Sequence, residues 1–372
     1  MLIEVDRSGS VAALTALFNQ MSDDSQVKSI LVLACDDNGY TPETLDPILA
    51  KLSKPVFGGI FPEIIAGHEK LSTGCIVAGL HHDASVQVIP GLSDSRVDYE
   101  SLIDDTQQQS DPRTLFICVD GFGERIGTLI YDLFNVYGLE FNYIGGGAGS
   151  LSFERKPCVF TPEGLLEDAA VLAMLALDSG VGVSHGWSDV AGPFKVTESE
   201  GNVIKTLDWK PAFRLYREVV EAHASQQFTD DNFFDIAKSY PFGINKLGTE
   251  KIVRDPIKVG DDEELICVGE VPQEAYVHIL TGDATSLVSA AQHALTLSEA
   301  SLTTAAEQRT TLFIDCISRV LFLEDEFDRE LQAVSRAGVP LIGALTLGEI
   351  ANSRKDYLEF YNKTSVVGVL QG

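Results

Sequence analysis

Positive charge is scarce in this sequence. Among its 372 residues, 27 are Lys or Arg and 55 are Asp or Glu, which gives a formal net charge of −28. No run of Lys and Arg reaches three residues. A chain of this charge repels phosphate backbones and anionic lipid surfaces. The composition therefore argues against nucleic acid and membrane surfaces as partners.

Long hydrophobic runs and paired cysteines are also lacking. The longest apolar run covers residues 169–177, about half of the roughly 20 residues that a membrane helix needs. Asp6 and Arg7 interrupt any export signal at the N-terminus. The six cysteines lie far apart and form no CxxC pair, which argues against a zinc site or redox dithiol and favours buried, reduced thiols. We expect a cytoplasmic protein without a membrane span.

The apolar segments that are present predict an α/β fold. With 45% hydrophobic and 22% charged residues, the chain has the composition of a folded globule. Its length exceeds the roughly 250–300 residues at which single cores stop growing. We therefore predict mixed sheets flanked by helices, in two intimately packed halves. Strands are expected at 29–34, 74–80, 85–89, 114–119, 170–177, 265–268, 275–280, 311–317 and 365–370, and helices at 11–21, 42–52, 124–137, 211–224, 284–299 and 324–337.

A weak internal repeat runs through the chain. SILVLACDDNGY, RTLFICVDGFGE and TTLFIDCISRVL each look like a strand that ends in a polar loop. Each is followed by a helix, by an apolar segment that turns on glycine, and by a further strand. Glycine permits close approach of a ligand or a second backbone, so the turns at Gly58–Gly59, Gly145–Gly147 and Gly343 are predicted to line a shared cavity. The alternative is the ordinary repetition of strand–helix–strand units in any α/β protein.

Two glycine motifs resemble catalytic or nucleotide-binding loops without fitting them. The stretch from Gly145 to Ser150 is not followed by Lys-Ser/Thr or by a helix, so a phosphate loop or dinucleotide fingerprint is disfavoured and a backbone-lined turn is favoured. The segment Gly182–Gly186 matches the GxSxG nucleophile elbow around Ser184. The residues that follow cannot start the helix that such an elbow needs, so a serine hydrolase is only an alternative.

Two further segments are candidates for ligand binding. His185, Gly186 and Trp187 could present a hydrogen-bonding ring and a stacking surface, or could equally be packed in the core. Near the C-terminus, Cys316 lies at a strand end beside Arg319, which could lower its pKa, although such a thiol is more often buried and inert. Arg319 and Glu349 could clamp a zwitterionic ligand or pair with each other. The adjacent pair His81–His82 cannot chelate one ion from a strand, and the sequence contains no HxxxH.

These motifs together resemble the FIST family of intracellular signal-transduction domains over roughly residues 29–370. The matching segments, in order, are PVFGGIFPEI, GCIVAGL, NYIGGGAG, VSHGWSDVAGPFKVTESEGNVIKTLDWKPAFRLY, YPFGI, IVRDPI, DCISR, GALTLGEI and Asn-Lys-Thr. The resemblance implies a FIST N-type module at residues 1–215 and a FIST C-type module at 216–372. It also implies a ligand-binding sensor of bacterial signal transduction and not an enzyme.

A sharper hypothesis follows from the same resemblance. A stand-alone FIST chain of this length is similar to bacterial haem proteins that sense nitric oxide and regulate a partner histidine kinase. This branch implies haem as cofactor with a His as axial ligand of the iron, and His185 is the first candidate, with His68 and His278 in reserve. The alternatives are a sensor of a small organic ligand such as an amino acid, and a hydrolase that uses Ser184.

Overall fold

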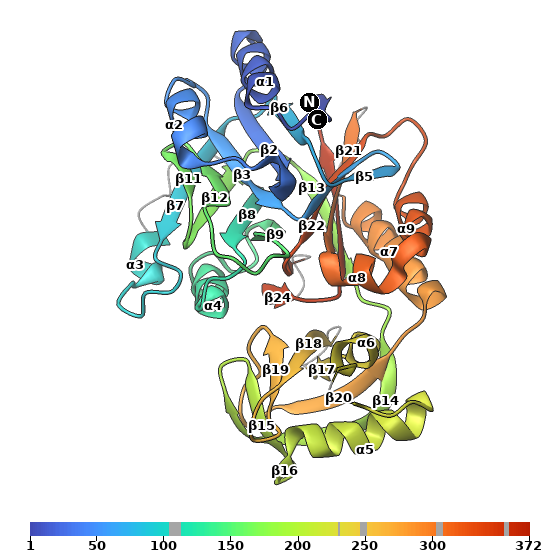
Figure 1. Cartoon of the computed structure of the whole chain (residues 1–372). Helices are drawn as coiled ribbons and strands as arrows, with labels where there is room; N and C mark the ends of the chain where they lie inside the picture. The colour runs from blue at the N-terminus through green and yellow to red at the C-terminus, as the bar shows by residue number, and fades with distance from the viewer. Residues whose placement is uncertain (104–112, 230, 246–250, 303–307, 353–356) are drawn as a thin grey trace.

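The described part of the chain folds into four β-sheets with helices packed around them (Figure 1). The computed structural model describes residues 1–103, 113–229, 231–245, 251–302, 308–352 and 357–372. Three of the sheets have six strands, and the fourth has seven. The predicted α/β class with mixed sheets is confirmed.

The three six-stranded sheets are built from three units with the same order of elements. Each unit runs strand, helix, strand, helix, strand, hairpin, strand. The first comprises β1 (Leu2–Asp6), α1 (Val11–Asp23), β2 (Ser29–Cys35), α2 (Pro42–Leu49), β3 (Val56–Phe61), β4 (Glu63–Ala66), β5 (Glu69–Leu71) and β6 (Cys75–Leu80). The second comprises β7 (Ala84–Pro90), α3 (Tyr99–Ile103), β8 (Thr114–Asp120), α4 (Ile126–Tyr137), β9 (Asn142–Ala148), β10 (Val159–Thr161), β11 (Gly164–Leu166) and β12 (Ala169–Leu175).

The third unit follows the same plan but is interrupted. It comprises β13 (Ser179–Ser184), α7 (Ala284–Ser301), β21 (Arg309–Cys316), α8 (Ile317–Leu323), α9 (Phe327–Ala333), β22 (Leu341–Thr346), β23 (Glu349–Asn352), β24 (Glu359–Tyr361) and β25 (Ser365–Gln371). In each unit one parallel pair (β2/β3, β8/β9, β21/β22) is flanked by an antiparallel strand (β6, β12, β25). The predicted repeat of strand–helix–strand units is therefore present, in three copies.

The units exchange their hairpins in a ring. The β4–β5 hairpin of the first unit pairs with β22 of the third, and β10–β11 of the second pairs with β3 of the first. The β23–β24 hairpin of the third unit pairs with β9 of the second, which closes the ring. Each six-stranded sheet thus contains strands from two units. We call this three-sheet assembly with its helices the main body.

The glycines that were predicted to form turns lie inside buried strands. Gly58 is in β3, Gly145 in β9 and Gly343 in β22, at the same place in each unit. A Cβ at each would collide with the carbonyl oxygen of the facing parallel strand, at Val32, Ile117 or Phe313 respectively. Glycine is needed because two backbones approach each other here. The prediction of turns around a shared cavity was wrong, since neighbouring backbone fills that space.

A smaller lobe is inserted between β13 and α7, and it lies below the main body in Figure 1. It comprises β14 (Ser188–Glu200), β15 (Val203–Leu207), β16 (Lys210–Pro211), α5 (Ala212–Ala224), α6 (Phe233–Ala237), β17 (Phe242–Ile244), β18 (Ile252–Val259), β19 (Leu265–Val268) and β20 (Tyr276–Thr281). Its sheet has the order β14-β20-β17-β18-β19-β15-β16. We call residues 188–281 the small lobe. The family boundary predicted at residue 215 falls within its helix α5.

Local sequence explains the best-predicted helices. Ser10 caps α1 by accepting a hydrogen bond from the Ala13 amide at 3.2 Å, and the helix buries Leu14, Phe18 and Met21 along one face. The helix predicted at 324–337 is shorter, because a 3₁₀ turn occupies Glu324–Glu326 and α9 ends at Ala333. In the described part of the chain, no helix combines the length and apolarity needed to cross a bilayer.

Candidate functional site

A cleft of about 690 Å³ separates the main body from the small lobe. On the body side, its walls are the residues that follow the parallel strands of the second and third units, including Gly121–Glu124 after β8, Cys316–Ser318 at the end of β21 and Leu347 after β22. On the lobe side lie β18, β19 and the residues after β19. The carboxyl ends of parallel strands are the usual ligand sites of α/β sheets. We call this space the interlobe cleft.

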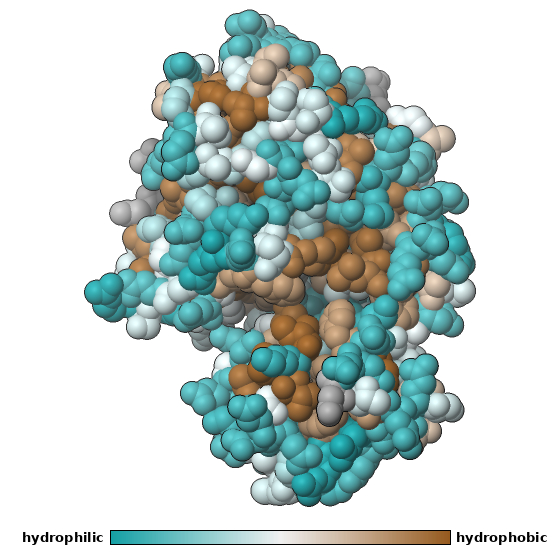
Figure 2. Space-filling model, in the orientation of Figure 1, coloured by the Kyte–Doolittle hydropathy of each residue, from teal (hydrophilic) through white to brown (hydrophobic). Residues whose placement is uncertain are grey.

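The mouth of the interlobe cleft is apolar. Leu151, Phe153, Phe234 and Leu321 all line it and are 40%, 66%, 37% and 40% exposed, respectively. Figure 2 shows hydrophobic surface bordering the gap between the main body and the small lobe. The ring of Phe153 packs against that of Phe122, with centroids 6.1 Å apart. Exposed apolar side chains gathered around a concavity are typical of a binding site.

The floor of the cleft holds a buried guanidinium. Arg254 of β18 is 7% exposed, and its Nη1 donates to the carbonyls of Val253 and Phe360 at 3.0 Å each and to Asn362 Oδ1 at 3.2 Å. Its Nε donates to the carbonyl of Glu270 at 2.9 Å. Burial lowers the pKa of Arg254 to about 10. All of these acceptors are neutral, so they solvate the charge without cancelling it.

Two buried polar atoms beside Arg254 have no hydrogen-bond partner. Asp255 is 2% exposed and uses Oδ2 in an ion pair with Lys363 Nζ at 3.0 Å, while its Oδ1 is unsatisfied. Asn362 is 1% exposed and uses Oδ1 to accept from Arg254, while its Nδ2 is unsatisfied. Both residues line the cleft. A buried acceptor and a buried donor left unpaired beside one cavity are candidate contacts for a ligand.

A buried ionic cluster lies behind the cleft. Arg319 of α8 is fully buried, with its Nε 3.1 Å from Asp315 Oδ1 and its Nη2 bonded to Glu330. The Ser365 hydroxyl lies within hydrogen-bond distance of both carboxylates, at 3.0 and 3.1 Å, and shares its one proton between them. Burial raises the pKa of Asp315 well above its usual value. Arg319 therefore pairs with Asp315 and Glu330, and neither it nor Glu349 lines the cleft to clamp a ligand.

Cys316 is the predicted site residue that does border the cleft. Its thiol lies 3.1 Å from Ser318 Oγ and is hydrogen-bonded to Glu349, which also accepts from Thr346 Oγ1 at 3.0 Å. Burial raises the pKa of the Cys316 thiol, and raises the pKa of Glu349 to about 8. The neighbouring cation does not lower the pKa of Cys316, because removal from water has the larger effect. The thiol is a protonated hydrogen-bond donor in the wall of the cleft.

The His185–Trp187 segment supports the floor from behind. Trp187 is 5% exposed, its Nε1 donates to the Lys363 carbonyl at 3.1 Å, and its ring lies 5.2 Å from that of Phe322. The Lys363 ammonium lies 5.3 Å from the Trp187 ring centre. Gly186 packs against the Ser286 carbonyl, where a side chain would not fit. These residues hold Lys363, and through it Asp255, in place.

The histidines fit haem ligation poorly. His185 is 6% exposed and its Nδ1 accepts the Trp187 amide at 2.8 Å. This tautomer places the proton on Nε2, the nitrogen that would bind iron. His68 is exposed between β4 and β5, and His278 contacts Asp189 and Asn245. None of the three lines the cleft, and the described residues contain no group of three His, Cys, Asp or Glu that could hold a metal.

The remaining residues that were predicted to form the site are buried in strands or at their ends and do not line the cleft. Gly145, Gly146 and Gly147 are buried in β9, and the Gly147 amide donates to the Gly348 carbonyl at 2.8 Å, so they let the segment that carries Leu347 approach. Ser184 is 5% exposed at the end of β13, and a strand, β14, begins at Ser188. The strand–turn–helix geometry of a nucleophile elbow is not formed there.

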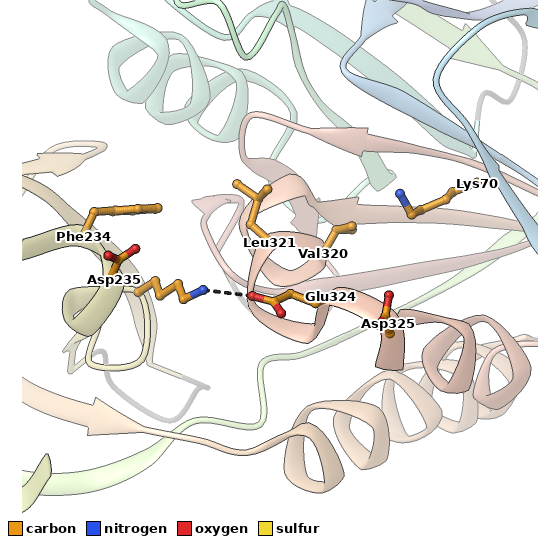
Figure 3. A pocket seen from close by; sticks show the side chains of 8 residues that line it. Lys70, Phe234, Asp235, Val320, Leu321, Glu324 and Asp325 are labelled. Atoms are coloured by element: carbon orange, nitrogen blue, oxygen red, sulfur yellow. Dashed lines mark hydrogen bonds and ion pairs between the residues drawn. The ribbon is translucent and has the colours of Figure 1, made fainter. Parts of the chain in front are cut away.

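A second concavity of about 490 Å³ adjoins the mouth (Figure 3). It shares Phe234 and Leu321 with the interlobe cleft. Lys238 from the small lobe and Glu324 from the main body form an ion pair of 3.2 Å beside it. With the buried Lys363–Asp255 pair, this makes two ionic contacts that fix the small lobe to the body.

Arg254, Asp255 and Asn362 are the residues that reasoning from the sequence missed. A signal was present, because Arg-Asp within the otherwise apolar strand IVRDPI places two charges where a sheet buries side chains. Nothing in the sequence shows that β18 lies beside residues 360–363.

Two family models match consecutive parts of the chain, and their boundary falls inside the small lobe. Residues 29–210 match the FIST N domain and residues 212–352 match the FIST C domain. No match to a curated protein is found. With both domains present in order, the chain belongs to the FIST family, whose domains are associated with signal-transduction sensing.

Proposed function

We propose that this protein is a cytoplasmic sensor that binds a small organic molecule in the interlobe cleft. The observation that carries the proposal is the pair of unsatisfied buried atoms, Asp255 Oδ1 and Asn362 Nδ2, on the floor of an apolar-mouthed cavity. Leaving such atoms unpaired costs free energy, which a ligand with matching donors and acceptors recovers. The association of the FIST domains with signal transduction also supports a sensory function.

Binding without turnover suits the chemistry of the cleft. The thiol of Cys316 is held protonated by burial, and no histidine lines the cavity in the described part of the chain. A ligand that contacts both walls adds to the contacts that join the small lobe to the body. It transmits a signal only if it binds one arrangement of the two more tightly than another. We propose that a partner signalling protein, such as a histidine kinase, responds to that arrangement.

The proposal is tested by measuring thermal unfolding against a set of small metabolites. We expect at least one compound to raise the Tm of the wild type. Leu321→Trp, at the mouth of the cleft, should abolish that rise because the indole fills the entrance. Leu297→Trp is the matched control, since Leu297 is 38% exposed on α7 and does not line the cleft.

The two variants separate cleft binding from binding elsewhere. A compound that stabilises the wild type and Leu321→Trp equally would show that its site lies outside the cleft. If no compound of any charge class stabilised the wild type, the sensor proposal would fail.

A further inference from the structure

Arg254 places a buried cation on the floor of the cleft, and the carboxylates of Glu124 and Glu270 also line the cavity. The ammonium of Lys363 is already paired with Asp255, so these two side chains together are neutral. The guanidinium of Arg254 forms no ion pair with any described carboxylate, and its Nη2 makes no hydrogen bond within the described part of the chain. The carboxylates of Glu270, Glu349 and Glu359 act on Arg254 without forming an ion pair with it. A buried cation that lacks an ion-pair partner is stabilised by an anion that reaches it.

The polar groups around Arg254 are arranged for a planar anion. Asn362 Oδ1 accepts from Arg254 Nη1 at 3.2 Å, which brings the free Nδ2 of Asn362 next to the guanidinium. Two neighbouring donors of this kind, one of them charged, suit the two oxygens of a carboxylate. The unsatisfied Asp255 Oδ1, one residue along β18, can accept one further hydrogen bond from a hydroxyl or N–H group of the same ligand.

The rest of the cavity suits an apolar body. From the floor, the walls lead to Leu151, Phe153, Phe234 and Leu321 at the mouth. At about 690 Å³ the cavity is within the range of sites that enclose molecules larger than a simple amino acid. An amino-acid zwitterion would bring an ammonium close to the Arg254 guanidinium, and the charge of Asp255 is committed to Lys363.

We propose that the ligand is an amphipathic carboxylic acid. Its carboxylate binds Arg254 and Asn362, a hydroxyl near the carboxylate donates to Asp255 Oδ1, and its aliphatic or aryl body extends to the apolar mouth. This inference rests on the proposed function and adds the ligand class.

Isothermal titration with matched compounds tests the ligand class. Octanoate, 3-hydroxyoctanoate, octanol and octylamine share an apolar body but differ in charge and in the extra donor, and leucine adds an amino acid with a shorter apolar side chain. We expect 3-hydroxyoctanoate to bind most tightly, octanoate next, and the alcohol, amine and amino acid at least tenfold more weakly than octanoate.

Substitution of Asn362 tests the carboxylate site. Asn362→Asp keeps the oxygen that Arg254 uses but neutralises the guanidinium, so octanoate affinity should fall at least tenfold. Asn245→Asp adds the same charge at an exposed position and should leave affinity unchanged. Because Asn362 is buried, Leu321→Asp at the exposed mouth provides a second variant, which should weaken octanoate by opposing its apolar body.

The outcomes distinguish this inference from the proposed function. Equal octanoate affinity in the wild type and a folded Asn362→Asp would overturn the carboxylate assignment. Equal affinity in the wild type and Leu321→Asp would overturn the placement of the apolar body at the mouth. Tighter binding of leucine or octylamine, blocked by Leu321→Trp, would also overturn the carboxylate assignment while leaving the interlobe cleft as the sensory site.

Discussion

Arg319 Nε lies 3.1 Å from Asp315 Oδ1 where β21 passes into α8, and both side chains are completely buried. The same guanidinium binds Glu330 and donates to the carbonyls of His185 at 2.8 Å and Leu287 at 3.0 Å. One cation thereby connects a strand, two helices and the loop that leads into the small lobe. The cluster fixes the body side of the cleft.

Removing this cation should be costly. We expect Arg319→Met to lower the free energy of unfolding by about 3–5 kcal/mol, because two carboxylates are left buried without a counter-charge. Urea denaturation measures the change. Arg329→Met is the matched control, since Arg329 pairs with Glu326 at the surface with both side chains about half exposed, and it should change stability little. If both variants lost the same free energy of unfolding, the buried cluster would contribute no more to stability than a surface ion pair.

The close approach of parallel strands gives a second prediction. Gly343→Ala should prevent the protein from accumulating in folded, soluble form, because its Cβ would collide with the Phe313 carbonyl in a buried strand. Gly338→Ala should cost only about 1 kcal/mol, since Gly338 has a positive φ of 76° but open space around it. Yield and thermal unfolding compare the two, and a well-folded Gly343→Ala protein would contradict the strand packing.

The buried carboxyl of Glu349 should make stability depend on pH. Its pKa rises from 4.5 to about 8 on folding, so the folded state holds the proton more tightly and stability falls as pH rises across that window. At about 1.4 kcal/mol per unit, this contribution is at most about 5 kcal/mol. Glu349→Gln should flatten the decline in unfolding free energy between pH 5 and 8. Glu324→Gln, at an exposed site, should retain the wild-type slope.

Ser184 should not act as a nucleophile. It is 5% exposed and is followed by a strand in place of the helix that exposes a catalytic serine. A fluorophosphonate probe should leave Ser184 unmodified, as judged by intact mass and peptide mapping. Stoichiometric labelling at Ser184 would favour a hydrolase over a sensor.

Haemin provides a fifth test. Because Nδ1 of His185 accepts the Trp187 amide, we expect no Soret band typical of ligation by this histidine. Absorption spectra of haemin titrated into the wild type and His185→Ala should coincide. A band that His185→Ala removes would restore the haem branch and its axial-ligand assignment.

Strands made of continuous apolar residues could be predicted from the sequence, because burial on both faces selects Val, Ile, Leu and Phe. Residues 265–268 coincide with β19, and 114–119 match β8 to within one residue. β14 was missed because its residues are largely exposed or half-buried and polar, and β18 because it contains Arg254, Asp255 and Pro256. The glycine segments were misread, because a close approach of backbones and a tight turn select the same residue.

Only part of the site could be predicted from the sequence, because its main contact joins residues that are far apart along the chain. Cys316 stood out because a polar loop follows an apolar strand, and it does line the cleft. Arg254 and Asn362 are 108 residues apart and meet only because the small lobe docks on the segment before β25. No local pattern encodes such a contact.

The ring of exchanged hairpins has a consequence for synthesis on the ribosome. A nascent chain that ends at residue 211 can complete one six-stranded sheet, but its β4–β5 hairpin must wait for β22 and its β9 edge for β23. The matches to FIST N and FIST C meet at this point, so a cut there yields fragments that each lack strands supplied by the other. Fragments of this kind are expected to fold by mutual complementation when they are produced together, and to require chaperones when they are produced alone.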